Sequence, residues 1–410
     1  MEKKKLIILL VGIFFLALIL RIGFISTLDN TVDVWGDWWD ELGWKLATGQ
    51  GYWVNNPYFS DGPVYYSWRS PVFPLFLAGV YKLFGHSFLA AKICLAIVSS
   101  ITCLLLFSLG RILLDNKSAI LTSLLYVFYP PGIFWTGYLV PVTLEIFFAL
   151  LTVYLCFLAE KKQDSLLFFI SGFVLGFGVL TRSLFLVFIP AIFIWLTVIC
   201  NVKFALKNTV YMLLSCFIVM TPWILRNYHI HKTILLTSTE GGIVCYIANN
   251  EKSLYQDSGY WDPTGRYDEP VIKAIKGLSE VETDRYFYRA AFNFIKNNPH
   301  VYFRLVADRF VRFWRISPHT FSGPGENYKS YHVKVAILTN LPIFILAGLG
   351  FIFSLRKWRE YLLIYLLIIF LSIPVILFFK TVIRYREPLM PFLIIMAVFG
   401  IRCFIPEKNK

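Results

Sequence analysis

Charged residues are scarce in this chain of 410 residues: only 16% are Asp, Glu, Lys or Arg, whereas 57% are hydrophobic. A soluble domain has roughly a quarter charged residues and about half apolar ones. The apolar excess is arranged in long runs, which need a bilayer to cover them. The composition therefore excludes an ordinary soluble domain and indicates a membrane protein.

Several signatures of other protein classes are missing. The seven cysteines form no CxxC pair, which argues against a disulfide framework or a zinc cluster. The six histidines show no HExxH spacing, so we predict no catalytic zinc. The net charge of +14 accompanies no nucleic-acid-binding module, and we interpret it as a report of membrane orientation rather than of a nucleic acid partner.

Ten apolar segments come near the ~20 residues with which a helix crosses ~30 Å of hydrocarbon. They are 5–26, 88–110, 118–135, 142–159, 166–181, 183–200, 208–225, 335–354, 360–379 and 388–404. An eleventh run, 71–84, is short. If it does not span, the basic residues of the short connections fall on the same side as the N-terminal lysines. We therefore predict that 71–84 is a helix in the outer interface and that both termini are cytoplasmic.

This topology divides the chain into three parts. Residues 1–225 form an N-terminal membrane module with seven spans, the first uncleaved, and an acidic first outer loop at 27–70. Residues 226–334 form a long extracytoplasmic region, helical over 281–315 with a break at Pro299. Residues 335–410 form a C-terminal membrane module with three spans. The expected fold class is an all-α polytopic membrane protein.

The first outer loop combines acids with tryptophans, and it contains six of the chain's twelve tryptophans. The stretch 37–46 is predicted to be an amphipathic interfacial helix. Its polar face carries Asp37, Asp40, Glu41 and Trp44, and its other face carries Trp39. Such a cluster suits a base that activates an acceptor, beside rings on which a sugar stacks. The alternative is an aromatic belt with solvated acids.

Charged groups in unexpected places provide the remaining candidates. Glu145 lies a few residues inside an apolar helix, which indicates either a functional carboxylate or a structural ion pair with an arginine. Five arginines lie at outer ends of spans, where positive charge is not expected. They are Arg69, Arg182, Arg226, Arg384 and Arg386. Arginine is suited to grip a phosphate, and the alternative for each is snorkelling to lipid headgroups.

The order of these features resembles GT-C type polyprenyl-phosphate-sugar glycosyltransferases (glycosyltransferase family 39), in the branch of the protein O-mannosyltransferases and the lipid A aminoarabinose transferase. After the acidic loop, the matching pieces are Leu46-Ala-Thr-Gly49-Gln-Gly51-Tyr52, Arg69-Ser-Pro71, Tyr129-Pro130, Thr143-Leu-Glu145, Gly178-Val-Leu-Thr-Arg182, Pro222-Trp223-Ile-Leu-Arg226 and Arg384-Tyr-Arg-Glu-Pro388. They extend over about 20–392.

The resemblance implies a GT-C fold and an inverting transfer, on the outer face of the cell membrane, of a hexose or pentose from undecaprenyl- or dolichyl-phosphate to a hydroxyl acceptor. The carried-over roles are a base at Asp37 or the Asp40-Glu41 pair, donor-phosphate binding by the five arginines, and stacking by Trp39, Trp44 and Tyr52. The acceptor (protein, lipid or glycan) and a divalent cation such as Mg²⁺ or Mn²⁺ are left open.

Three other interpretations compete with this one. A secondary transporter would show repeat symmetry and charges near the midplane, and this chain shows no repeat between its halves. A surface-polysaccharide polymerase or ligase would share the donor and the location but use other outer-loop acids and bases. A non-enzymatic scaffold would leave Glu145 without an explanation.

Overall fold

The computed structural model describes residues 3–31, 38–59, 62–254, 269–318 and 330–404. These residues are nearly all helical, and the only strand-like pairing among them is the isolated bridge between Val54 and Tyr65. The predicted all-α membrane class is confirmed.

Each of the ten predicted spans corresponds to a helical segment. These segments are α1 (Lys3–Ile25), α4 (Phe88–Leu113), α5 (Asn116–Val127) with α6 (Pro130–Phe134) and the 3-10 turn η1 (Trp135–Gly137), α7 (Val142–Lys162), α8 (Ser165–Thr181), η2 (Ser183–Val187) with α9 (Phe188–Ile199), α10 (Val202–His231), α15 (Ser330–Ser354), α16 (Trp358–Phe378) and α17 (Met390–Phe404). Two consecutive prolines open α6, and the chain bends there by 56° because proline cannot continue the hydrogen bonding of the preceding helix.

Length and composition separate these segments into two groups. Within the described ranges, six helical segments are long and apolar enough to cross a membrane, or seven if the bent pair at α5 and α6 is one span. One of the six, 330–378, contains both α15 and α16, joined by the 3-10 turn Leu355–Lys357. The helices α8 and α9 are shorter.

The short apolar run forms α3 (Val72–Phe84), which ends at Gly85 with φ +72°. Its 13 residues reach about 20 Å at 1.5 Å per residue, less than the ~30 Å of hydrocarbon. It packs against α2 (Trp39–Ala47), the helix predicted in the first outer loop. The two approach closely at Gly43, where an added Cβ would lie 2.6 Å from the Cβ of Leu77.

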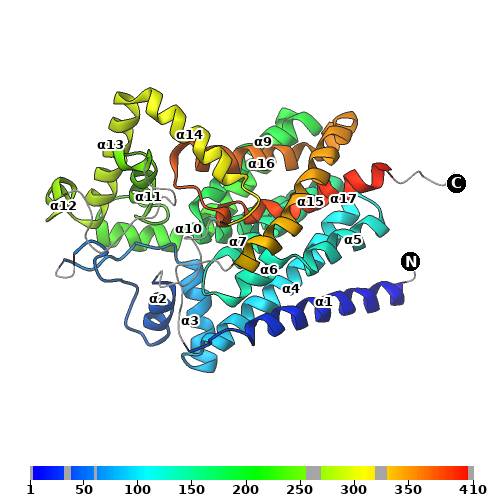
Figure 1. Ribbon diagram of the computed structural model, residues 1–410, viewed down its shortest axis with the longest axis horizontal. Coiled ribbons are helices and arrows are strands. Elements are labelled where there is room, and N and C mark those ends of the chain that lie inside the picture. Colours follow the sequence, from blue (N-terminus) through cyan, green and yellow to red (C-terminus); the bar gives the residue numbers. More distant parts are fainter. Residues whose placement is uncertain (1–2, 32–37, 60–61, 255–268, 319–329, 405–410) are drawn as a thin grey trace.

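The second outer region contains α11 (Gly241–Ala248), η3 (Glu251–Leu254), α12 (Glu269–Ile275), α13 (Glu280–Asn297) and α14 (Pro299–Phe313). The predicted helix break at Pro299 is confirmed. A capping box between Ser279 and Glu282 starts α13. In Figure 1 both chain ends lie at one end of the bundle, and α2, α3, α11, α12 and α13 gather at the opposite end. These five helices therefore share one side of the molecule.

Candidate active site

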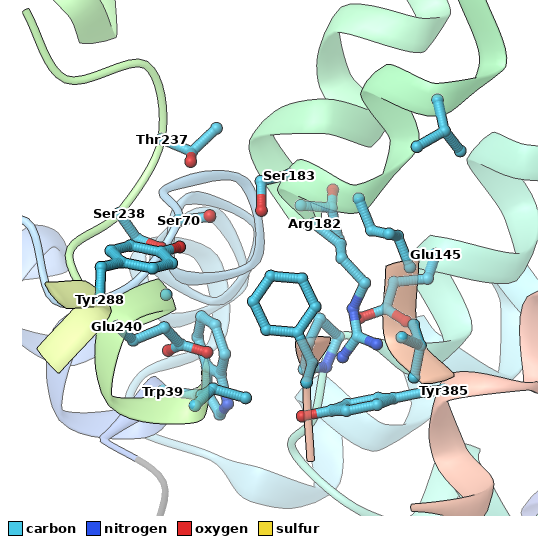
Figure 2. Close-up of a pocket in the computed structure, with 18 residues that line it drawn as sticks. Trp39, Ser70, Glu145, Arg182, Ser183, Thr237, Ser238, Glu240, Tyr288 and Tyr385 are labelled. Carbon is cyan, nitrogen blue, oxygen red and sulfur yellow. The ribbon is translucent and has the colours of Figure 1, made fainter. Parts of the chain in front are cut away.

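A cavity of about 340 Å³ lies where the first outer loop and α11 meet the ends of the membrane helices (Figure 2). Figure 2 shows Ser70, Thr237, Ser238 and Glu240 on one side of it, the polar wall, and Glu145 and Arg182 on the other. The lining residues are Trp39, Ser70, Pro141, Glu145, Thr181, Arg182, Ser183, Leu184, Val187, Thr237, Ser238, Glu240, Gly241, Val244, Tyr288, Val375, Phe379 and Tyr385. Three residues predicted from the sequence, Trp39, Glu145 and Arg182, therefore face one space.

The membrane side of the cavity is organised by an ion pair. Glu145, in the first turn of α7, is fully buried, and its Oε1 lies 2.9 Å from Nε of Arg182, directly after α8. The Arg182 guanidinium lies over the ring of Tyr385, 4.3 Å from its centroid, and Figure 2 shows it between Glu145 and Tyr385. Within the described chain, Glu145 is the only charged partner of Arg182. The terminal nitrogens of this arginine can thus meet an anion in the cavity.

A second ion pair lies on the loop side, between Arg69 and Glu240. The Arg69 guanidinium also lies 4.9 Å from the ring centroid of Trp39. Glu240 was not among the residues predicted from the sequence. The feature of the sequence that could have indicated Glu240 is the Gly241-Gly242 pair directly after it. A Cβ on Gly241 would collide with the Tyr288 hydroxyl, and a Cβ on Gly242 would collide with the backbone of α13, so only glycine allows the close approach at these two positions. This close approach sets the start of α11, and with it Glu240, against the cavity.

Two of the predicted first-loop acids have partners elsewhere. Asp40 accepts hydrogen bonds from the Tyr81 hydroxyl (2.5 Å) and from Nε2 of His86 (2.9 Å). Glu41 pairs with Lys45 at 2.5 Å. Neither lines the cavity. Asp37 lies outside the described residues.

The aromatic residues predicted to stack on a sugar also separate. Trp39 lines the cavity, whereas Trp44 stacks on His86 with ring centroids 4.6 Å apart. Tyr52 is buried and donates its hydroxyl to the carbonyl of Arg69 at 2.8 Å. Its position therefore supports the backbone that carries Arg69.

The other three arginines have different surroundings. Arg226 donates to the carbonyl of Tyr52 at 2.9 Å and so holds the first loop from α10. Arg386 is fully buried and donates to the carbonyls of Phe313 (2.9 Å) and Arg315 (2.7 Å). These two lie outside the cavity lining, as does Arg384, whose guanidinium lies 5.6 Å from the ring centroid of the cavity residue Tyr385.

Two carboxylates on α13, the buried Glu280 and the partly buried Asp284, hold the outer loops together. Glu280 accepts hydrogen bonds from the backbone N–H of Tyr66 (2.7 Å) and Ser67 (2.9 Å) in the first loop. Asp284 accepts the N–H of Gly242 at 2.6 Å. Burial raises the pKa of Glu280, and burial raises the pKa of Asp284 to about 7. The resulting contacts fix the loops that form the polar wall.

A metal site is not evident in the described part of the chain, where no three His, Cys, Asp or Glu side chains are close enough to hold an ion. The divalent cation left open from the sequence stays a prediction.

Comparisons with known proteins identify the fold. Residues 68–225 match the family model of dolichyl-phosphate-mannose-protein mannosyltransferases. The oligosaccharyltransferase of Archaeoglobus fulgidus, tethered to an acceptor peptide, aligns with a TM-score of 0.60 at 14% identity, over 98% of this chain and 50% of that one. The AglB oligosaccharyltransferase of the same organism, in complex with an inhibitory peptide and a dolichol-phosphate, gives 0.56 at 12% identity, over 98% and 52%. ArnT from Cupriavidus metallidurans gives 0.44 at 10% identity, over 97% and 77%.

The chain therefore has the GT-C fold, and the predicted resemblance to GT-C membrane enzymes is confirmed. It spans about half the length of the Archaeoglobus structures that it matches. A search of curated protein sequences finds no match.

Proposed function

We propose that this protein is a glycosyltransferase that moves a sugar from a polyprenyl phosphate to a hydroxyl acceptor on the outer face of the membrane. One observation carries the proposal. Within a GT-C fold, the cavity brings together three features. These are Arg182, a cation whose terminal nitrogens can meet an anion, the aromatic ring of Trp39, and apolar side chains.

The residues that line the cavity suit the two parts of such a donor. Val187, Val375 and Phe379 offer an apolar flank beside the membrane helices, which fits a prenyl chain. Arg182 is close to this flank and would bind the phosphate through its terminal nitrogens. The AglB structure that holds a dolichol-phosphate supports this ligand class for the fold.

The polar wall suits the sugar. Ser70, Thr237 and Ser238 line it together with Trp39, so hydroxyl groups and an aromatic face meet in one place. Hydroxyl side chains exchange hydrogen bonds with sugar hydroxyls, and a tryptophan ring covers the apolar face of a sugar.

The reaction requires a base and a stabilised leaving group. A carboxylate takes the proton of the acceptor hydroxyl, the acceptor oxygen attacks the anomeric carbon, and the bond from that carbon to the phosphate oxygen breaks with inversion. Arg182 neutralises the charge that develops on the phosphate. We assign the base to Asp37, which precedes Trp39 by two positions in the sequence, since Asp40 and Glu41 have other partners. Glu240 is the second candidate, because it faces the cavity.

The orientation follows from charge. The basic connections and both chain ends belong to the end of the bundle away from α2 and α11. The positive-inside rule assigns that end to the cytoplasm, which puts the cavity on the outer face.

The test is consumption of radiolabelled polyprenyl-phosphate sugars by the purified protein in liposomes. We expect wild-type protein to release the lipid phosphate from at least one donor. Asp37→Asn should lower the rate by about 10²–10⁴-fold, whereas Asp40→Asn, the matched control, should retain most of it. Arg182→Gln should lower kcat/KM for the donor by roughly 10–100-fold, and Arg356→Gln, an exposed arginine of the 3-10 turn before α16, should not.

Failure of wild-type protein with every donor would refute the function. Full activity of Asp37→Asn together with loss in Glu240→Gln would move the base to Glu240.

A further inference from the structure

Helix α14 (Pro299–Phe313) has three distinct faces. At about 100° per residue, Leu305, Arg309 and Phe313 share a face that is buried against the protein. A second face exposes large apolar side chains: Phe303 is 69% exposed, Phe310 54% and Val311 66%.

The third face of α14 is charged. It carries Arg304, Asp308 and Arg312, and Arg312 pairs with Asp308 at 2.6 Å. An exposed apolar face beside a charged face is the pattern of a helix at a boundary between hydrocarbon and water. In water alone the apolar stripe would be unfavourable, at about 25 cal/mol for each Å² left uncovered.

The position of α14 puts these faces at such a boundary. From the buried face, Arg309 donates to the carbonyls of Ile376 (2.8 Å) and Leu377 (2.8 Å), at the very end of the membrane helix α16. The ring of Phe292, which precedes α14, lies 6.0 Å from that of Phe378, the last residue of α16. Figure 1 shows α14 on the periphery of the molecule next to α16. The helix is thus level with the point where a spanning helix leaves the hydrocarbon.

We propose that α14 is an interfacial helix that inserts Phe303, Phe310 and Val311 into the bilayer leaflet at the end of the bundle away from the chain termini. Its partner is the lipid surface. The charged face lies at the headgroups, where Arg304 meets lipid phosphates. The apolar face continues the lipid-covered surface of α16 beyond the end of that span. This contact does not depend on the reaction in the cavity.

The experiment is site-specific photo-crosslinking of the full-length protein in liposomes of phosphatidylcholine and phosphatidylglycerol with radiolabelled acyl chains. A p-benzoylphenylalanine replaces Phe303 or Phe310, which keeps an aromatic ring at each position. The matched control replaces Asp308 on the charged face of the same helix. Each variant is first shown to elute and unfold like the wild type.

We expect several-fold more labelled lipid on the protein from positions 303 and 310 than from position 308. Equal labelling from all three positions would overturn the proposal, because it would reflect non-specific contact with lipid. Absence of lipid adducts at 303 and 310 in folded protein would also overturn it, as would a cross-link from these positions to a second polypeptide in native membranes.

Discussion

Removal of the Arg309 guanidinium should destabilise the outer region without altering any residue that lines the cavity. Arg309 is 5% exposed and joins three helices. Besides its two contacts with α16, it donates to the carbonyl of Ala248 (2.6 Å) and to Oδ1 of Asn249 (3.0 Å) at the end of α11. Burial lowers the pKa of Arg309 to about 10, so the group stays charged at neutral pH.

The magnitude follows from these four hydrogen bonds. Arg309→Met keeps much of the side-chain volume but leaves the carbonyls at the ends of α11 and α16 without their donor. At about 1 kcal/mol for each bond, the expected loss of unfolding free energy is roughly 3–5 kcal/mol. At about 2.1 cal/mol/K of unfolding entropy per residue, a chain of this size should then lose roughly 3–6 °C in apparent Tm. Because α11 carries Gly241 and Val244 of the cavity wall, transfer activity should fall as well.

The assay is thermal unfolding of purified protein in one detergent at one heating rate, followed by tryptophan fluorescence. A fixed heating rate is needed because membrane proteins often unfold irreversibly. Arg304→Met, an exposed arginine of the same helix, is the control and should change Tm by less than about 2 °C. An Arg309→Met variant as stable as this control would refute the view that Arg309 fastens α11 to α16.

Two further predictions concern the contact between α11 and α13. Because the folded-state pKa of Asp284 is raised to about 7 from 3.8, the folded chain keeps a proton between about pH 4 and 7 that the unfolded chain has lost; stability should therefore fall as pH rises through this window. Tm measured against pH should show this decline in the wild type and a shallower one in Asp284→Asn, and equal slopes would contradict it. Gly242→Ala should cost about 1–3 kcal/mol, because its Cβ would collide with the backbone of Asp284. Gly12→Ala in α1, where an added Cβ meets no atom within 4 Å, is the control, and equal Tm values for both variants would argue against the tight contact.

The membrane helices could be predicted because hydropathy and charge act locally. Runs of apolar residues mark the spans. The break between α13 and α14 coincides with Pro299, because a proline ring disfavours the helical conformation of the residue before it. The amphipathic pattern of 37–46 likewise predicted α2, because a period of 3.6 residues is visible within one segment.

The partners of the charged residues could not be predicted in this way. Arg182, Arg226 and Arg386 all lie at the ends of predicted spans. Arg226 and Arg386 donate to backbone carbonyls, whereas Arg182 faces the cavity. The difference depends on which loop folds over each arginine, and that is decided by contacts between residues far apart in the sequence. Hydropathy gives the depth of a charge in the membrane and not the direction of its side chain.

The pairing of Arg69 with Glu240 is the clearest case of such a long-range contact. The two residues are separated by 171 positions, and each belongs to a different outer loop. Their approach depends on Glu280, which holds the backbone of the first loop, and on Gly242, which lets α11 settle against α13. Glu280 and Gly242 do not line the cavity. The cavity's polar wall is therefore a product of loop-to-loop packing, and substitutions at these supporting positions should alter donor use as surely as substitutions in the wall itself.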